Sequence, residues 1–229
     1  MATLVAFPYS HKHYDSLPDI MDASKALATS GALDSLASTI GSVFVKHGVE
    51  NVFGLILLHR HFDMEPTELL VGFGHVSVPW NTTCNRGEMN NVKPISWRFL
   101  PEGIVPYEFT TDKATVLPES QGYDAFVQEL GDLLKAMHLD QLLGLCQIPE
   151  SSIRSPATME FTSGRANVTV PDVMWVLDSE SAAVEASWQF ETQGTTDGPG
   201  PVVFKKCKNK CEYKAATQTH TQRHLTTKK

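Results

Sequence analysis

The chain has 229 residues, of which 41% are hydrophobic and 20% are charged, and its formal net charge is -7. This composition is typical of globular proteins and excludes a wholly disordered chain. The longest uninterrupted apolar run, residues 52–58, is far shorter than the roughly 18 residues of a membrane-spanning helix. Because the first residues also lack the basic start of a signal peptide, we expect a soluble, cytoplasmic protein without a membrane segment.

Hydrophobic periodicity predicts three helices and a larger number of short strands. The helices are expected at residues 16–30, 33–47 and 122–138. The strands are expected at residues 52–59, 68–78, 95–100, 104–110, 142–148, 158–170 (as a hairpin), 173–177 and 184–190. Residues 79–91 are polar and are expected to form a loop.

Strands that follow one another in runs, with helices in separate blocks, favour an α+β fold. The sequence therefore predicts a mostly antiparallel sheet packed by about three helices. Residues 1–191 are expected to form the globular domain, and residues 192–204, where Gly and Pro gather, a linker. Residues 205–229 are expected to form a basic tail, and truncation after Gly200 is expected to leave the thermal midpoint of the domain within a few degrees.

The charge of the tail differs from that of the rest of the chain. Residues 205–229 contain eight Lys or Arg residues and a single acidic residue, Glu212, although the chain as a whole is acidic. Such a tail is suited to an anion: nucleic acid, an acidic partner protein or the acidic body of its own chain. The body itself is not expected to bind nucleic acid, because phosphate contacts need a basic face.

The sharpest cluster of polar residues follows the strand predicted at residues 52–59. His59 and His61 are two residues apart, so an extended chain would present both imidazoles on one side. Asp63 and Glu65 follow with the same spacing. Imidazoles and carboxylates are common ligands of divalent transition metals. These four residues are the first candidate metal site, with zinc or another divalent metal as its ion.

The pattern His, basic residue, His, aromatic residue, Asp occurs twice in the sequence. Its first copy is His11-Lys12-His13-Tyr14-Asp15, and the second is residues 59–63. The interpretations left open are a site shared by the two copies and a coincidence of short patterns.

The second copy resembles a motif of metallo-β-lactamase-fold hydrolases. In that family a His-x-His-x-Asp-His loop follows an apolar strand, as Ile56-Leu-Leu-His-Arg-His-Phe-Asp63 does here. The resemblance implies a metal-bound hydroxide that attacks the substrate. Met64 stands where the last histidine of the motif belongs.

The same histidines also belong to a stretch that is similar to the first motif of cupin barrels, Gly54-x4-His59-x-His61-x3-Glu65-x6-Gly72. This resemblance implies that His59, His61 and Glu65 bind a metal. Pro106 stands where the further cupin histidine belongs. Residues 52–71, with Leu-Leu-His-Arg-His-Phe, also resemble a group of uncharacterised fungal proteins, and this resemblance implies no activity.

A second candidate metal site lies in the tail. Cys207, Cys211, His220 and His224 offer two thiolates and two imidazoles, which is a common tetrahedral zinc set. The alternative is a disordered basic tail with scattered Cys and His residues. Trp80, on the loop predicted at residues 79–91, and His75 are the candidate residues of a ligand pocket.

Two functions from different classes fit these features. The first is a binding or interaction protein, whose partner is a protein or a small molecule and whose basic tail engages that partner with or without zinc. The second is a small metal-dependent enzyme, cupin-like or hydrolase-like, that uses His59 and His61. Because the sequence contains no complete catalytic set, the first function is favoured.

Overall fold

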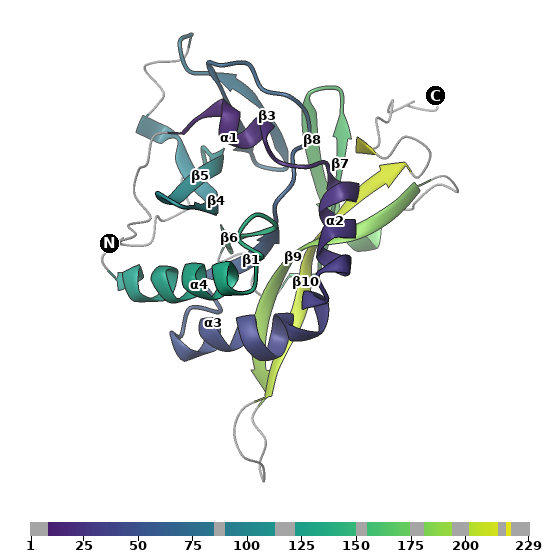
Figure 1. Ribbon diagram of the computed structural model, residues 1–229. Helices are drawn as coiled ribbons and strands as arrows, with labels where there is room; N and C mark the ends of the chain where they lie inside the picture. Colours follow the sequence, from purple (N-terminus) through teal and green to yellow (C-terminus); the bar gives the residue numbers. More distant parts are fainter. Residues whose placement is uncertain are drawn as a thin grey trace.

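The structure is a computed structural model, and it describes residues 9–84, 90–112, 122–149, 155–174, 181–193, 202–214 and 219–220 (Figure 1). Within these residues, ten strands close into a mixed β-barrel. Their order around the barrel is β10-β7-β8-β3-β2-β5-β4-β6-β1-β9, and the pairing of β9 with β10 closes it. The two-residue strand β11, Thr219–His220, pairs with β10 outside this ring.

Most neighbouring strands are antiparallel, and only β2 with β5 and β7 with β10 are parallel among the described pairs. The strands are β1 (Phe53–Leu57), β2 (Glu68–Phe73), β3 (Val76–Asn81), β4 (Lys93–Leu100), β5 (Gly103–Thr110), β6 (Leu143–Gln147), β7 (Thr158–Ser163), β8 (Ala166–Pro171), β9 (Ser181–Gln193) and β10 (Val202–Lys214).

Helices cover one part of the barrel. The α-helices are α1 (His11–Asp15), α2 (Ile20–Thr29), α3 (Ser42–Lys46) and α4 (Asp124–Ala136). The shorter helical turns are η1 (Ala32–Asp34), η2 (Leu36–Gly41, a π-helical segment) and η6 (Asp172–Met174). In Figure 1, α3 and α4 lie beside each other, and α2 runs along β9 and β10. No helix in the described part of the chain is long and apolar enough to cross a membrane.

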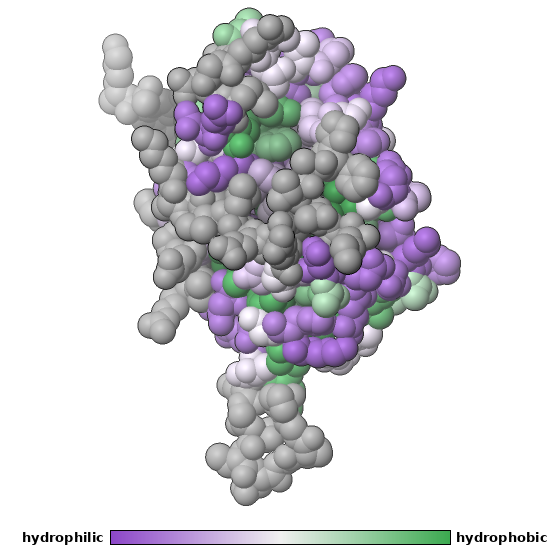
Figure 2. Space-filling model, turned by 90° about the vertical axis from the view of Figure 1, so that its left-hand side faces the viewer, coloured by the Kyte–Doolittle hydropathy of each residue, from purple (hydrophilic) through white to green (hydrophobic). Residues whose placement is uncertain are grey.

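The main core lies between these helices and the barrel wall. Along β1, Phe53, Leu55 and Leu57 pack with the helical residues, and Trp188 and Phe190 of β9 join them. Side chains alternate along a strand, so Ile56 and Leu58 belong to a second cluster with Tyr14 of α1 and Tyr107 of β5. The part of the surface that is coloured in Figure 2 is mostly hydrophilic, with small hydrophobic areas.

The prediction of an α+β sheet packed by helices is wrong, because the sheet closes into a barrel. The closing strand is β10, which lies in the region that the sequence assigns to the linker and the basic tail. It pairs with β9 along its whole length and with β7 on its other side. The sequence did not predict this strand because five of its thirteen residues are Lys, although Cys211 and Glu212 are fully buried in it.

Three lysines of β10 contact acidic groups of the same chain. Lys205 pairs with Glu185 at 3.0 Å, Lys206 with Glu191 at 3.2 Å and Lys210 with Asp172 at 2.8 Å. These lysines therefore pair with the acidic body of their own chain, which is one of the three kinds of anion that the sequence suggests for the tail. Residues 221–229 lie outside the described residues.

Several predicted elements are confirmed and others are corrected. The hairpin at residues 95–110, the helix at 122–138 and the hairpin at 158–170 are confirmed with small shifts of their ends. The single strand expected at 68–78 is two strands, because Gly74 adopts a φ of 64° and reverses the chain. The helix expected at 16–30 begins at Ile20 in α2, and residues 175–177 of a predicted strand lie outside the described residues.

Candidate metal site

The segment that carries the two histidines leaves β1 and is held by α1. The backbone N–H of His61 donates to the hydroxyl of Tyr14 at 3.0 Å, and that of Met64 donates to the Asp15 carboxylate at 3.0 Å. The guanidinium of Arg60 donates to the carbonyl of Asp15 at 3.2 Å. The two copies of the His-basic-His-aromatic-Asp pattern therefore contact each other, through Tyr14 and Asp15 rather than through a shared set of imidazoles.

His59 is oriented by the backbone. Its Nδ1 lies 2.8 Å from the carbonyl oxygen of Leu57, which only accepts hydrogen bonds, so Nδ1 carries the proton. Nε2 then offers its lone pair, and it lies 3.4 Å from the Sγ of Cys211. The side chain of His59 is 4% exposed, so water does not compete freely for this nitrogen. This is the arrangement in which metal-binding histidines are commonly held.

His61 lies beside His59 and between two carboxylates. The ring centroids of the two histidines are 4.9 Å apart, and the rings meet edge to face. The Nε2 of His61 is 3.1 Å from a carboxylate oxygen of Glu160 on β7 and 3.5 Å from one of Glu108 on β5. The second oxygen of Glu108 accepts a hydrogen bond from the hydroxyl of Ser96 at 2.7 Å.

Glu160 is the acidic centre of this cluster. One of its oxygens accepts from the amide of Asn167 on β8 and the other from the amide of Asn209 on β10, both at 2.5 Å. Cys211 is the register partner of Glu160 in the parallel pair β7–β10, so these two residues stand at the same level of the barrel. The Nε2 of His59, the Sγ of Cys211 and a carboxylate oxygen of Glu160 all lie within 4.8 Å of one another.

Burial and charge set the protonation of these groups. Burial lowers the pKa of His59, the neighbouring His61 lowers it further, and the carboxylate of Glu160 does not compensate. Burial also raises the pKa of the Cys211 thiol well above its usual range, and Glu160 and Glu108 raise it further. His59 is therefore neutral at physiological pH, and Cys211 is a protonated thiol that lies within hydrogen-bond distance of its Nε2.

The pKa of His61 is shifted in the opposite direction to that of His59. Burial alone lowers the pKa of His61, but the carboxylates of Glu160 and Glu108 outweigh burial, and the pKa is raised. Burial alone raises the pKa of Glu108, but the hydrogen bond and charge of His61 and the hydrogen bond from Ser96 lower it overall. The acidic groups of this interior therefore favour a positive charge among them.

The structure separates the first predicted site. His59 and His61 enter the interior, but Asp63 does not follow them: its side chain is 83% exposed and pairs with Arg60 at 2.7 Å. Glu65 is also exposed, on the turn before β2. The reason is that the chain after β1 is not an extended strand, so the two-residue alternation on which the prediction depended ends at His61.

The second predicted site is also divided. Cys211 points to His59, whereas the thiol of Cys207 donates to the carbonyl of Asn209 at 3.4 Å. His220 lies in β11, and His224 is outside the described residues. The structure thus brings His59 of the first predicted site close to Cys211 of the second, with the carboxylate of Glu160 beside both. One feature of the sequence could have identified Glu160: it is an acidic residue between the apolar Met159 and Phe161 of a predicted strand.

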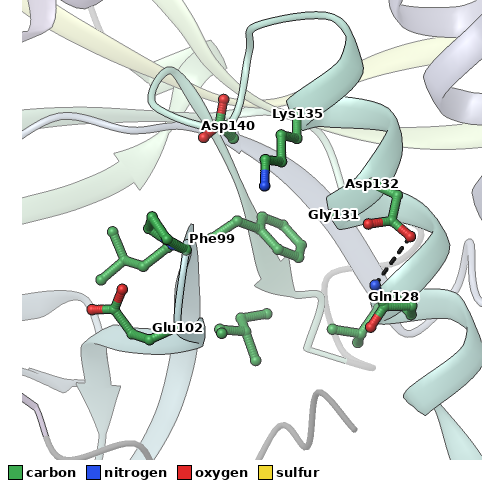
Figure 3. A pocket seen from close by; sticks show the side chains of 12 residues that line it. Phe99, Glu102, Gln128, Gly131, Asp132, Lys135 and Asp140 are labelled. Carbon is green, nitrogen blue, oxygen red and sulfur yellow. Dashed lines mark hydrogen bonds between the residues drawn. The ribbon is translucent and has the colours of Figure 1, made fainter.

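Three hollows of the surface are lined by described residues, and one of them, of about 390 Å³, is lined by residues 50–51 and by parts of β9 and β10. A second, of about 240 Å³, is lined by residues of β2 to β8, among them Glu108 and Glu160. The third, of about 260 Å³, is a groove between the β4–β5 turn and α4, where Phe99 lies below Lys135 and to the left of Asp132 (Figure 3). Trp80 and His75 line none of these three hollows: Trp80 is half-buried on β3, and His75 is exposed at the β2–β3 turn.

Comparison of the chain with models of protein families, with curated proteins and with solved structures gives no match. The resemblances to cupins, to metallo-β-lactamase-fold hydrolases and to fungal proteins therefore stay predictions.

Proposed function

We propose that this protein binds a divalent transition metal in its interior through the Nε2 of His59, the Sγ of Cys211 and the carboxylate of Glu160. The observation that carries the proposal is the convergence of these three buried atoms within 4.8 Å. One nitrogen, one sulfur and one oxygen ligand match the preferences of zinc, which binds four ligands in a tetrahedron. The three residues come from distant parts of the chain, so a bound ion would fasten the end of β1 to β7 and β10.

The electrostatics of the interior support a cation. The carboxylates of Glu108 and Glu160 oppose ionisation of the Cys211 thiol as long as no positive charge is added beside it. A divalent ion reverses this effect, because it stabilises the thiolate and replaces the thiol proton. The same raised pKa argues against Cys211 as a nucleophile, since the reactive form is the thiolate.

Access to the site is provided by the hollow of about 240 Å³. Glu160 lines it at its inner end, and the exposed Asp112 lines it as well, so it connects the carboxylate of Glu160 with the surface. Three protein ligands also leave a fourth zinc position for water or another small ligand. The proposed site is compatible with two functions. One is a metal-binding protein, and the other is a metal-dependent enzyme that uses His59 and His61.

Zinc binding by defined variants tests the proposal. Protein treated with a chelator and then titrated with Zn²⁺ is expected to bind one ion with high affinity. His59→Ala and Cys211→Ser are each expected to weaken this binding at least about tenfold, because each removes a ligand. Cys207→Ser is the matched control, since its thiol lies on the same strand and contacts a backbone carbonyl instead.

The control also separates the two candidate sites. A tail site built from Cys207, Cys211, His220 and His224 would lose zinc in Cys207→Ser and keep it in His59→Ala. That result, or unchanged affinity in both His59→Ala and Cys211→Ser, would contradict the proposal. Circular dichroism of each metal-free variant establishes that the fold is retained before zinc is added.

A further inference from the structure

The hollow beside the metal site has a chemical character of its own. Residues of β2 to β8 line it, and its volume is about 240 Å³. This volume admits a small organic molecule rather than an ion alone. We propose that the hollow binds a small molecule that carries a protonated amine, whether or not a metal is bound behind it.

Charge favours such a ligand. The carboxylates of Glu108, Asp112 and Glu160 line the hollow, and none of its described lining residues is Lys, Arg or His. His61 lies behind Glu108 and Glu160 and compensates one negative charge when it is protonated. The two buried carboxylates of Glu108 and Glu160 therefore keep one negative charge beyond the positive charge of His61, and this charge attracts cations and repels carboxylates and phosphates.

A buried hydrogen-bond acceptor points to the same ligand. Asn167 lines the hollow and is 4% exposed. Its amide nitrogen donates to Glu160, because a carboxylate oxygen only accepts, and this assigns the other amide atom as Oδ1. Among the described residues, nothing donates to this buried Oδ1. A buried acceptor without a donor costs free energy, and an ammonium group of a ligand would supply the donor.

The groove beside α4 provides a comparison within the same molecule. It has nearly the same volume and is also lined by three acidic residues, Glu102, Asp132 and Asp140. Lys135 stands among them, however, as Figure 3 shows, and Asp132 accepts a hydrogen bond from Gln128 at 3.0 Å. A cation is therefore already present in that groove, and we expect no selectivity for amines there.

Calorimetric titration of chelator-treated protein tests the inference with three probes of equal length. These are 1,4-diaminobutane, the neutral 1,4-butanediol and the dianion succinate. We expect the diamine to bind about tenfold more tightly than the diol, and succinate not to bind, because charged hydrogen bonds are the stronger ones. Absence of diamine binding, or equal affinity for diamine and diol, would overturn the inference.

Two variants locate the binding. Thr169→Lys places an ammonium group in the hollow and is expected to abolish binding of the diamine. Gln128→Lys introduces the same group into the groove beside α4 and is expected to leave diamine binding unchanged. The reverse pattern would refute the assignment of the site. Asp112→Asn, at an exposed position, is expected to weaken binding about threefold without disturbing the fold.

The metal proposal and this inference fail separately. Every titration is made without metal, so a protein that binds no zinc can still bind the diamine. Cys211→Ser, which removes a proposed zinc ligand and does not line the hollow, is expected to retain diamine binding. Loss of diamine binding in this variant, with the fold intact, would contradict the independence of the two sites.

Discussion

His61 shows how much a single buried side chain can depend on distant strands. Its imidazole is 2% exposed and contacts carboxylates of β5 and β7, which are separated from it by 47 and 99 residues in the sequence. The local pattern identified both histidines as candidate ligands. The same pattern predicted Asp63 and Glu65 as the acidic residues of the site. The carboxylates that contact His61 belong instead to Glu108 and Glu160, which only closure of the barrel brings close to it.

Removal of the His61 imidazole is expected to lower the free energy of unfolding. His61→Ala leaves the buried carboxylates of Glu108 and Glu160 without their cation, and such changes cost about 3–5 kcal/mol. We expect urea denaturation of metal-free protein to show a loss of this size. His47→Ala is the control, because His47 pairs with Glu129 at 2.8 Å near the surface, and its effect is expected to be much smaller. Equal losses in the two variants would contradict a buried ion pair around His61.

At the scale of elements, local chemistry predicted the turns and the apolar strands well. Pro101-Glu102-Gly103 and Ser163-Gly164-Arg165 are turns, and the apolar stripe of residues 122–138 is helix α4. The pattern failed at β10, where positively charged side chains occupy a strand whose lysines pair with acids of the same chain. Such pairs depend on tertiary structure, so no local rule reveals them.

The close packing of β1 against β9 leaves no room for a larger residue at Gly54. Gly54 lies where β1 passes β9, and a Cβ at this position would stand 2.7 Å from the backbone oxygen of Trp188. Since backbone cannot move aside cheaply, Gly54→Ala is expected to destabilise the protein by about 1–3 kcal/mol. Gly72→Ala in β2 is the matched control, because its nearest contacts would be 3.4 Å or longer. Thermal denaturation compares the two, and an equal loss of stability would contradict the tight approach of β1 and β9.

At the scale of the whole molecule, closure of the barrel changes the expected role of the C-terminal region. Sequence composition predicts that the residues after Gly200 are dispensable for the stability of the domain. The structure places β10 between β9 and β7 and buries Cys211 completely. Truncation after Gly200 would therefore open the barrel and expose the edges of two strands.

We expect the chain truncated after Gly200 to lose its cooperative thermal transition, or to unfold at a temperature lower by more than about 10 °C. A chain truncated after Lys214 keeps β10 and loses, among the described elements, only β11. It is expected to unfold within a few degrees of the full chain. If both truncated chains were equally stable, β10 would not be a structural strand of the barrel.

We propose that the interior binds one metal ion through three protein ligands: a nitrogen, a sulfur and an oxygen. X-ray absorption spectroscopy of the zinc-loaded protein measures these ligands directly. We expect one sulfur at about 2.3 Å, with nitrogen and oxygen atoms completing the shell at about 2.0–2.1 Å. A shell with two sulfurs would assign the ion to both cysteines of β10, and a shell without sulfur would exclude Cys211. Either result would contradict the proposed site.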